Sequence, residues 1–479
     1  MANTLTQNRA ERRRMMLNEP VGKIVTIIAI PMIISMMVDS LYNIADTYFV
    51  SQLGKAATAA VGVNDSMTHF IRACAMGFGI GASSYMSRLL GAKRDEEACR
   101  VGNTTLFTSM IALSALAVLA FIFVDPLVSL LGATPSAKPY AMSYARCILL
   151  SVPFTAGEVS LSHMLRSEGS TRYSMIGMVS GCVVNVALDP LFIHTLGLEV
   201  AGAAIATSIS KCVSFLVLLW PFLRKKTMLE LSFRYFTPKW SIYREVARMG
   251  IPTFLRASLM STSTVVINNF AGSFSDSALA AVSVANKCTR LVGSAIMGFG
   301  QGFQPVAGYC WGAKRYHRVN RAFWVSTSIG AVMAVVIGGA MGIFAPQLVA
   351  VFAAKDAEII RLGTLMIRTQ CVTMFAHVWV MIINGLFQAL GRALPAAILG
   401  LSRQAICLIP AVIALSLLFG VNGLAVSQAS ADLLSMAIAI PMVVKITREI
   451  RRLSETAEVA EDPPPEDDPP VEQEADLDA

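Results

Sequence analysis

Long runs of apolar residues, separated by short polar segments, dominate the pattern along this chain. Each run supplies the roughly 20 helical residues that a crossing of a ~30 Å bilayer core requires. We therefore expect an all-α integral membrane protein with twelve transmembrane helices. Their approximate bounds are 21–50, 56–87, 101–124, 140–165, 173–196 and 201–223 in the first half, and 247–272, 278–309, 319–345, 359–390, 394–417 and 424–444 in the second.

The pattern of the first half returns in the second half. Residues 59–94 align with residues 280–315 without a gap, at an offset of 221, and 14 of these 36 positions are identical. AAVGV, MGFGIG and GAKR in the first copy correspond to AAVSV, MGFGQG and GAKR in the second. A repeat of this length predicts two copies of one structural unit. We therefore expect two six-helix lobes.

The loops between the predicted helices differ in charge. Lys and Arg gather in every second connection, whereas the other connections hold Lys55, Lys138, Lys355 and little else. Because Lys and Arg collect on the cytoplasmic side of a membrane, both termini are expected in the cytoplasm. Each unit then enters the membrane from the same side, so the pseudo-twofold axis that relates the lobes should follow the membrane normal, as it does in two-lobed transporters.

These features divide the chain into five parts. The final part is acidic, rich in proline and poor in large apolar residues, so it cannot bury enough surface to order itself and is expected to be disordered. The parts are a cytoplasmic N-terminal segment 1–20, an N-terminal lobe 21–223, a basic cytoplasmic linker 224–245, a C-terminal lobe 246–447 and an acidic cytoplasmic tail 448–479.

Composition limits the class of protein. Hydrophobic residues make up 55% of the chain and charged residues only 15%, which excludes an ordinary soluble domain. The formal net charge of +8 fits a basic membrane face, and no soluble basic domain is present to bind nucleic acid. Nine cysteines without a CxxC motif predict packing residues rather than a structural metal site. We expect a monomer in the cytoplasmic (inner) membrane.

Polar residues inside the first lobe are the candidates for function, because each is costly in a membrane and usually faces a cavity or a partner. Asp39, Asn43 and Asp46 follow a helical spacing and share one stripe of the first helix, and Asn185 and Asp189 share a face of the fifth. Asp46 and Asp189 each lie eight residues before a glycine, so we expect them at a similar depth. Together they form a candidate cation site, for Na⁺ through hard oxygen ligands or for H⁺ through a carboxylate in a low-dielectric environment.

The candidate cation site is not repeated in the second lobe. The positions equivalent to Asp46 and Asp189 hold Ile267 and Cys407 or its neighbours. This asymmetry favours one lobe handling the ion. Structural alternatives remain for Asp189 and Asp39. Asp189 precedes a proline and could satisfy backbone groups freed at a kink. Asp39 could pair with an arginine such as Arg72.

Further polar residues are candidates for a substrate cleft. Arg290 and Arg256 lie too far from the ends of their helices to snorkel into water, so we expect them to pair across helices or to line a wet cleft. The glycine-rich MGFGQGFQPVAGY sits inside an apolar helix with no preceding strand, which argues against a phosphate loop. The candidate cleft residues are Tyr42, Glu158, Asn286, Arg290, Gln301 and Gln304.

Five segments together resemble the multidrug and toxic compound extrusion (MATE) family. The resemblance covers roughly residues 23–445 and implies a two-lobed, twelve-helix exporter of amphipathic, often cationic compounds, driven by inward H⁺ or Na⁺ without an organic cofactor. The bacterial-type branch that the chain resembles implies a cation site at Asp46, Asn185 and Asp189, and bending of the first helix at Pro31. The segments are IPMIISMMVDSLYNIADTYFVSQLG, RSEG, VVNVALDPLFI, LEVAGAAIATSIS and GFGQGFQPVAGYCWGAKR.

The resemblance predicts transport by alternating access. Ion binding at Asp46 and Asp189 would change the packing of the first helix and evict the drug. Such a cycle requires that the ion affinity differ between the two states. Two other functions stay open. A flippase of lipid-linked intermediates would use a cationic cleft for pyrophosphate, for which Arg256, Lys287 and Arg290 are candidates. An intramembrane enzyme is disfavoured, because no nucleophile and base occur at catalytic spacing.

Overall fold

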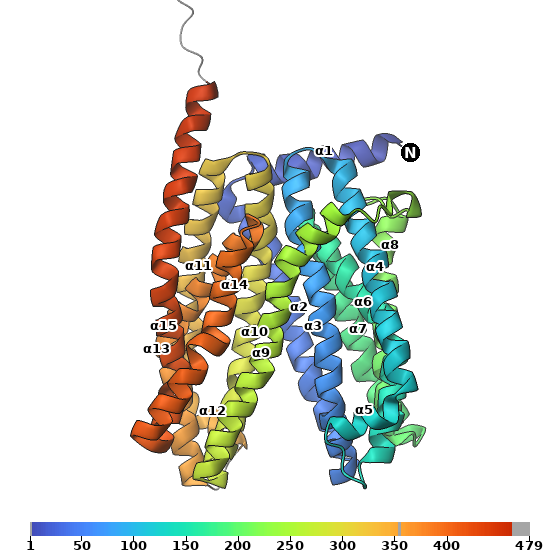
Figure 1. Cartoon of the computed structure of the whole chain (residues 1–479), viewed down its shortest axis with the longest axis vertical. Helices are drawn as coiled ribbons and strands as arrows, with labels where there is room; N and C mark the ends of the chain where they lie inside the picture. The colour runs from blue at the N-terminus through green and yellow to red at the C-terminus, as the bar shows by residue number, and fades with distance from the viewer. Residues whose placement is uncertain (1, 353–355, 462–479) are drawn as a thin grey trace, which may run out of the picture.

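The computed structural model describes residues 2–352 and 356–461, and all regular elements in this part of the chain are helical. Figure 1 shows two helical bundles that stand side by side. The first contains α2 (Val21–Ser51), α3 (Lys55–Gly91), α4 (Asp95–Ile122), α6 (Lys138–Ser167), α7 (Thr171–Pro190) and α8 (Glu199–Leu223). The second contains α9 (Trp240–Phe274), α10 (Asp276–Gly312), α11 (Tyr316–Ile343), α13 (Ala357–Ala389), α14 (Ala393–Leu401) and α15 (Leu408–Glu461).

These helices make twelve crossings. Eight segments of the described chain are long and apolar enough to span a membrane, and one of them, Ala393–Thr456, contains two crossings. It divides at Gly420, whose φ of 59° and ψ of −138° interrupt the helix. The remaining three crossings are α3, α9 and α10. These helices contact the opposite lobe and carry more polar residues than the eight apolar segments. The chain is a multi-pass membrane protein with two six-helix lobes, as its sequence predicts.

Several elements depart from the simple pattern of spans. The helices α1 (Ala2–Asn18), α5 (Val124–Leu130) and α12 (Ala345–Phe352) are additional short elements. A π-helical turn, Leu191–Thr195, extends α7, and a second, Ser402–Ile406, joins α14 to α15. The helix α9 begins within the expected linker, and α15 continues as a helix past the expected start of the tail at 448. The rest of the expected tail, 462–479, lies outside the described residues.

The two lobes meet on their pseudo-twofold axis through α3 and α10. Gly91 of α3 packs so closely on the carbonyl of Tyr309 that a Cβ would not fit, and Gly312 of α10 packs in the same way on the carbonyl of Arg88. Gly91 and Gly312, like Arg88 and Tyr309, differ by the repeat offset of 221. Reciprocal contacts of this kind are the signature of a twofold interface. The axis therefore passes between these helix ends.

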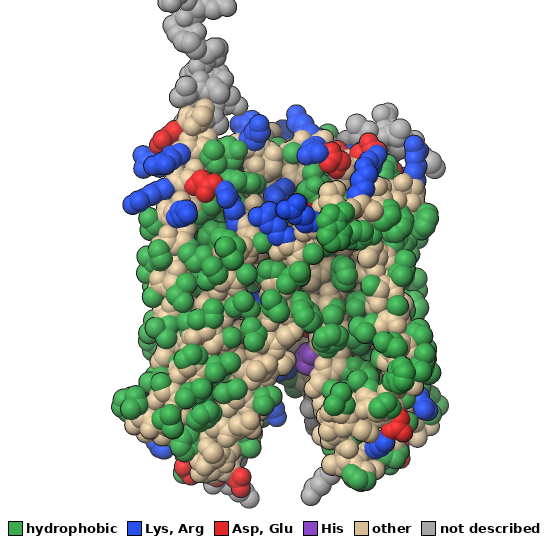
Figure 2. Space-filling model, viewed as in Figure 1, with side chains coloured by type: hydrophobic (Ala, Val, Ile, Leu, Met, Phe, Trp, Pro, Cys, Tyr) green, Lys and Arg blue, Asp and Glu red, His purple; other side chains and the backbone are tan. Residues whose placement is uncertain are grey.

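Contact between the lobes ends part of the way along the helices. Gly77 of α3 touches the backbone of Gly250 in α9, and farther along α3 and α9 the rings of Phe70 and Phe254 meet edge to face at 5.7 Å between centroids. Beyond these rings the lobes separate, and Figure 2 shows the hollow between them at the end of the molecule opposite α1. We call the α1 side the closed end and the opposite side the open end.

Charge is distributed unequally between the two ends. Figure 2 shows Lys and Arg side chains gathered at the closed end, a hydrophobic band around the middle of the molecule and fewer charges at the open end. The connection between the lobes also lies at the closed end and contains the exposed aromatic residues Phe233 and Trp240. Exposed aromatic rings beside basic residues are typical of a segment at a membrane interface.

The inter-lobe connection is fastened to the first lobe by a buried carboxylate. Glu168, directly after α6, is fully buried and accepts hydrogen bonds from the backbone N–H groups of Met228 (2.6 Å) and Leu229 (3.1 Å). Burial raises the pKa of the Glu168 carboxyl, while these hydrogen bonds and Arg12 favour its charged form. The start of the connection is therefore packed as a part of the first lobe.

The helix α1 lies across the closed end and binds both lobes. Its residue Met16 is fully buried, and the thiol of Cys310 in α10 lies 4.0 Å from the Met16 carbonyl. In the first lobe, Arg13 binds Asp95 at 2.9 Å. In the connection, Arg9 donates to the Met228 carbonyl (3.0 Å) and Arg12 donates to the Lys226 carbonyl (3.1 Å). From the second lobe, Arg318 of α11 donates to the carbonyl of Glu19, directly after α1, at 2.7 Å.

We predict that Gly91→Ala lowers the midpoint of thermal unfolding in detergent, because the added methyl group overpacks the contact with α10 at a cost of about 1–3 kcal/mol. Gly62→Ala is the matched control in the same helix, since no heavy atom lies within 4 Å of the Cβ position there. Equal midpoints for the two variants would contradict this account of the axis.

We predict that deletion of residues 2–17 exposes Cys310. The experiment follows the rate of maleimide labelling in a background in which the other eight cysteines are replaced by alanine. Cys310 is fully buried in the intact protein, so labelling should be slow with α1 present and faster by about tenfold or more without it, as expected for loss of a local closed state. An unchanged rate would show that α1 does not cover the closed end.

Candidate functional site

The first lobe encloses a small polar cavity between α2, α6, α7 and α8. Its free volume is about 10 Å³, which is room for about one water molecule. An ion or a water molecule can enter a space of this size, whereas a drug-sized molecule cannot. Its polar lining includes Asp39, Tyr42, Glu158, Asn185, Thr207 and Lys211.

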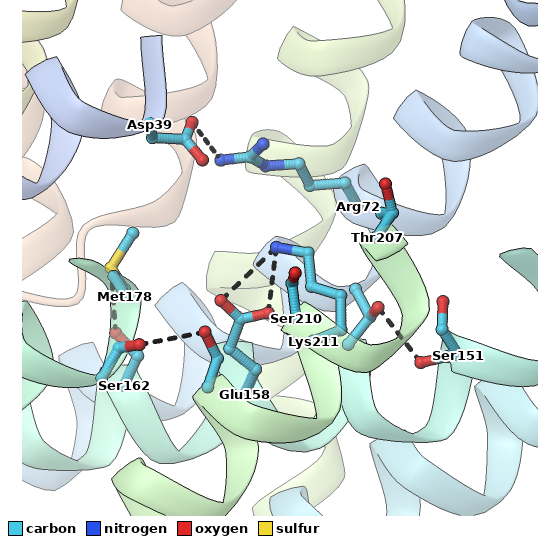
Figure 3. Close-up of polar contacts among 12 residues, drawn as sticks. Asp39, Arg72, Ser151, Glu158, Ser162, Met178, Thr207, Ser210 and Lys211 are labelled. Carbon is cyan, nitrogen blue, oxygen red and sulfur yellow. Dashed lines mark hydrogen bonds and ion pairs between the residues drawn. The ribbon is translucent and has the colours of Figure 1, made fainter. Parts of the chain in front are cut away.

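Two ion pairs form one side of this cavity. Arg72 of α3 binds the carboxylate of Asp39 at 2.8 Å, and Lys211 of α8 binds Glu158 of α6 at 3.1 Å. Figure 3 shows the two pairs close together, with the amine of Lys211 directed toward Glu158. The structure thus contains the pairing of Asp39 with Arg72 that the sequence left open as an alternative. Asp39 is therefore not an open carboxylate in this state.

Asn185, which lines the cavity, connects it to the other residues of the predicted cation site, Asp46 and Asp189. Asp189 is fully buried, and it interacts electrostatically with Asp46. With the Asn185 amide oriented to satisfy both of its polar groups, its nitrogen donates to Asp189 Oδ2 at 2.9 Å and its oxygen accepts from the backbone N–H of Thr207 at 3.2 Å. The helices α2, α7 and α8 thus gather these side chains at one place.

Asp46 and Asp189 differ from Asp39 and Glu158, the two carboxylates that line the cavity, in having no basic partner. Neither forms an ion pair within residues 2–352 and 356–461, and Asp46 Oδ1 is a buried oxygen without a hydrogen-bond donor there. Two acidic groups beside an amide and a hydroxyl offer hard oxygen ligands to a small cation. The described part of the chain contains no cluster of three or more His, Cys, Asp and Glu side chains suited to a metal ion.

The neighbouring residues of α2 have different surroundings. Tyr42 lines the cavity and interacts electrostatically with Asp46 and Asp189. The Asn43 amide donates to the carbonyl of Asp39, one turn earlier, at 2.5 Å. Pro31 lies inside α2, where its missing N–H removes one bond of the helix and makes bending easier.

The predicted cleft residues fall into three places. Tyr42 and Glu158 line the cavity of the first lobe, as described above. On α10, Gln301 accepts a hydrogen bond from Arg166 of the first lobe, and Gln304 donates to Gln388 of α13 at 3.3 Å. Asn286 and Arg290 are exposed nearer the open end of α10. The α10 residues therefore do not share one pocket: Gln301 contacts the first lobe, Gln304 contacts its own lobe, and Asn286 and Arg290 are exposed.

The second lobe contains a polar cluster that the sequence analysis missed. Asp432 of α15 is buried and binds Arg403 at 2.6 Å, and His377 of α13 lies 3.7 Å away from the same carboxylate oxygen. Lys211, Asp65 and His69 of the first lobe were missed as well. Each is an ionisable residue inside a predicted span, so the rule that selected Asp46 also points to them. The acidic group of the second lobe is paired, unlike Asp46 and Asp189.

Two repeated six-helix lobes around a cleft that opens to one side define a two-lobed membrane transporter. The MatE family model matches residues 31–191 and 252–413, once in each lobe. The chain belongs to this family, which consists of transporters rather than enzymes.

Relatives of known name and structure agree with this placement. The multidrug export protein MepA of Staphylococcus saprophyticus is 30% identical over 428 residues, covering 88% of this chain and 93% of the relative. MepA of Staphylococcus aureus is 28% identical over 445 residues, covering 92% and 97%. An outward-facing multidrug resistance MATE transporter superposes with a TM-score of 0.87 at 26% identity, covering 91% of this chain and 98% of that chain. A MOP superfamily transporter from Pyrococcus furiosus gives 0.85 at 26% identity, with the same coverage.

We predict that Glu158→Gln destabilises the protein, because it leaves the charge of Lys211 without a partner. A fully buried pair loses about 3–5 kcal/mol when one partner is removed, and the 26% exposure of Lys211 makes this an upper bound. Glu97→Gln, in the exposed pair with Arg94, is the control and should cost less than about 1 kcal/mol. The measurement is the midpoint of unfolding in detergent. Adding Lys211→Met to Glu158→Gln should recover much of the loss, and equal midpoints for Glu158→Gln and Glu97→Gln would refute the assignment.

Proposed function

We propose that this protein is a secondary multidrug efflux transporter that exports amphipathic, often cationic compounds in exchange for inward H⁺ or Na⁺. Membership of the MatE family and the likeness to proteins named for multidrug export support the class of substrate. The observation that carries the exchange is the pair of carboxylates without a basic partner in the described chain: Asp189, which is fully buried, and Asp46, which is half-buried with one buried oxygen. A membrane-embedded acid of this kind requires a mobile cation for at least part of its cycle.

The position of Asp46 links ion binding to the relation between the lobes. The helix α2 carries Asp46, packs on α7 with Asp189, and also packs on α10 of the second lobe. Ala29 of α2 lies directly on Gly302 of α10, so a shift of α2 is felt at the inter-lobe contact. A proton or Na⁺ that binds more tightly in one arrangement of α2 favours that arrangement. This difference in affinity drives the exchange.

The drug occupies the cleft between the lobes. Pockets for drug-sized molecules have volumes of ~300–1,000 Å³, far more than the cavity of the first lobe provides. Asn286 and Arg290 belong to the wall of this cleft, and Gln301 and Gln304 lie nearer its closed end. Tyr42 and Glu158 become accessible to a drug only when the cavity of the first lobe widens. Ion and drug therefore occupy neighbouring sites in this arrangement.

The closed end faces the cytoplasm. The gathering of Lys and Arg there follows the distribution that orients membrane proteins, and it supports two cytoplasmic termini in the inner membrane. In this orientation the cleft opens to the outside, so the structure corresponds to the state that releases drug and takes up the ion. The protein acts as a monomer whose partners are small amphipathic molecules and the lipid bilayer, and not nucleic acid.

A lipid-intermediate flippase is the second candidate. Arg256 of α9 forms no hydrogen bond or ion pair with any residue that the structure describes, and Lys287 and Arg290 are exposed on α10. Three cationic groups on the second lobe suit the pyrophosphate of such a lipid. Drug accumulation in cells with and without the protein separates the two candidates, because a dedicated flippase leaves drug accumulation unchanged.

We predict that Asp46→Asn and Asp189→Asn each abolish efflux of a fluorescent cationic dye from cells, with unchanged amounts of protein in the membrane. Asp125→Asn is the control, because Asp125 is exposed and pairs with Lys138 outside the cavity. In proteoliposomes, dye-induced proton flux under a pH gradient, compared with Na⁺ flux under a sodium gradient, identifies the coupling ion. Full efflux by both Asp46→Asn and Asp189→Asn would rule out the proposed exchange.

A further inference from the structure

The internal repeat places two pairs of residues at equivalent heights on the two sides of the cleft. Asp65 and His69 of α3 align with Asn286 and Arg290 of α10 at the repeat offset of 221. The helices α3 and α10 touch on the pseudo-twofold axis at the closed end and diverge from it toward the open end. Equivalent residues on two such helices lie at the same distance from the axis. The four side chains therefore belong to opposite walls of the cleft within one helical turn, with Asp65 level with Asn286 and His69 level with Arg290.

The two walls carry opposite charge at this depth. Asp65, His69 and Arg290 are all exposed, and neither Asp65 nor Arg290 forms an ion pair with another described residue. Arg290 nevertheless interacts electrostatically with both Asp65 and His69. Because the residues belong to different lobes, this interaction crosses the cleft. In the state described here, water in the open cleft solvates the charges.

We call the level of Asp65, His69, Asn286 and Arg290 the charged layer. It lies directly outside the last contact between the lobes. Phe70 of α3, which touches Phe254 of α9, follows Asp65 by five residues, a rise of about 7.5 Å along a helix. When the open end closes, the first parts of the two walls to meet are those just beyond these rings. Closure removes water from the charged layer, and a guanidinium that loses water without gaining a partner is strongly disfavoured.

We propose that Asp65 and Arg290 form an ion pair across the lobes when the open end closes, and that this pair is the outer gate of the transport cycle. The proposal rests on the alternating access of the proposed function and adds the contact that seals the outward side. Arg290 lies one helical turn, about 6 Å, nearer the closed end than Asn286, the repeat counterpart of Asp65, and its long side chain spans this step when the walls approach.

The gate also connects drug release to the ion site. Asp65 interacts electrostatically with Asp46, so the two carboxylates belong to one negatively charged region of the first lobe. When Arg290 binds Asp65, a fixed positive charge arrives beside this region. A mobile cation at Asp46 is then held less tightly, which favours its release on the cytoplasmic side. Closure of the outer gate and release of the ion thus support one another.

A charge exchange tests the pair directly. Gly62→Cys and Ser283→Cys are introduced into a cysteine-free background as reporters, since these positions are repeat equivalents, exposed, and one turn farther out. Cross-linking of the two cysteines by a short bifunctional maleimide reports closure of the open end. The variants are Asp65→Arg, Arg290→Asp and the two combined. Asp125→Arg, at an exposed acid away from the cleft, is the matched control.

We expect each single variant to reduce the cross-linked fraction by about five- to 150-fold, the usual range for a coupling between two sites, and the combined variant to restore it. Asp125→Arg should leave it unchanged. Restoration also shows that the variants fold, and gel filtration provides a second check. The proposal is wrong if the single variants cross-link like the parent, or if the combined variant cross-links no better than the single ones.

Failure of the gate can be told apart from failure of the proposed function. Cross-linking is measured without drug and without an ion gradient, so it needs no transport activity. If dye efflux proved independent of Asp46 and Asp189 while the charge exchange restored closure, the ion exchange would be rejected and the gate kept. If efflux required both carboxylates and the charge exchange failed, the gate alone would be rejected.

Discussion

The arrangement of this protein depends on the cost of keeping a charge in a membrane without a partner. Most deep acids that the structure describes meet this cost with a base: Asp39 with Arg72, Glu158 with Lys211, and Asp432 with Arg403. Asp46 and Asp189 do not, although they lie within a few turns of the paired groups. The two fixed pairs of the first lobe neutralise one another's charges and join α2 to α3 and α6 to α8. The site of Asp46 and Asp189 is left as the place where a mobile cation can bind and dissociate.

The pseudo-twofold axis gives the lobes a common pivot. Glycines at the closed end allow α3 and α10 to approach until their backbones touch, and such close-packed contacts do not tolerate added volume. The connection between the lobes and α1 surround this contact with hydrogen bonds to both halves. In the proposed alternating access, a change at the open end is a tilt of whole lobes about the closed end. The helix α2, which carries Asp46 and packs on α10, is placed to sense that tilt.

Much of this organisation could be predicted from the sequence, because spans and repeats are written in local patterns. The twelve crossings follow from the length of apolar runs, and the grouping of Asp46, Asn185 and Asp189 follows from helical spacing and depth. The partner of Asp39 could not be chosen, because Arg72 lies on another helix and helix packing decides the contact. The cavity volume depends on side-chain packing in the same way. The short helix α1 was missed because its polar sequence resembles a tail, and its order comes from contacts with both lobes.

In the proposed exchange, the number of carboxylates in the cation site limits the free energy that one transport cycle can use. In this proposed exchange, Asp46 and Asp189 bind at most two monovalent cations, so the stoichiometry is at most two ions for each drug molecule. With two protons entering for one singly charged drug leaving, one net positive charge moves inward, and a membrane potential of 100 mV adds about 2.3 kcal/mol to the driving force. With one proton for one such drug, the exchange is electroneutral, and only the concentration gradient of the proton drives it. In the described part of the second lobe the buried acid, Asp432, is paired with Arg403, so in the proposed exchange the carboxylates of the first lobe alone set the ceiling on drug accumulation.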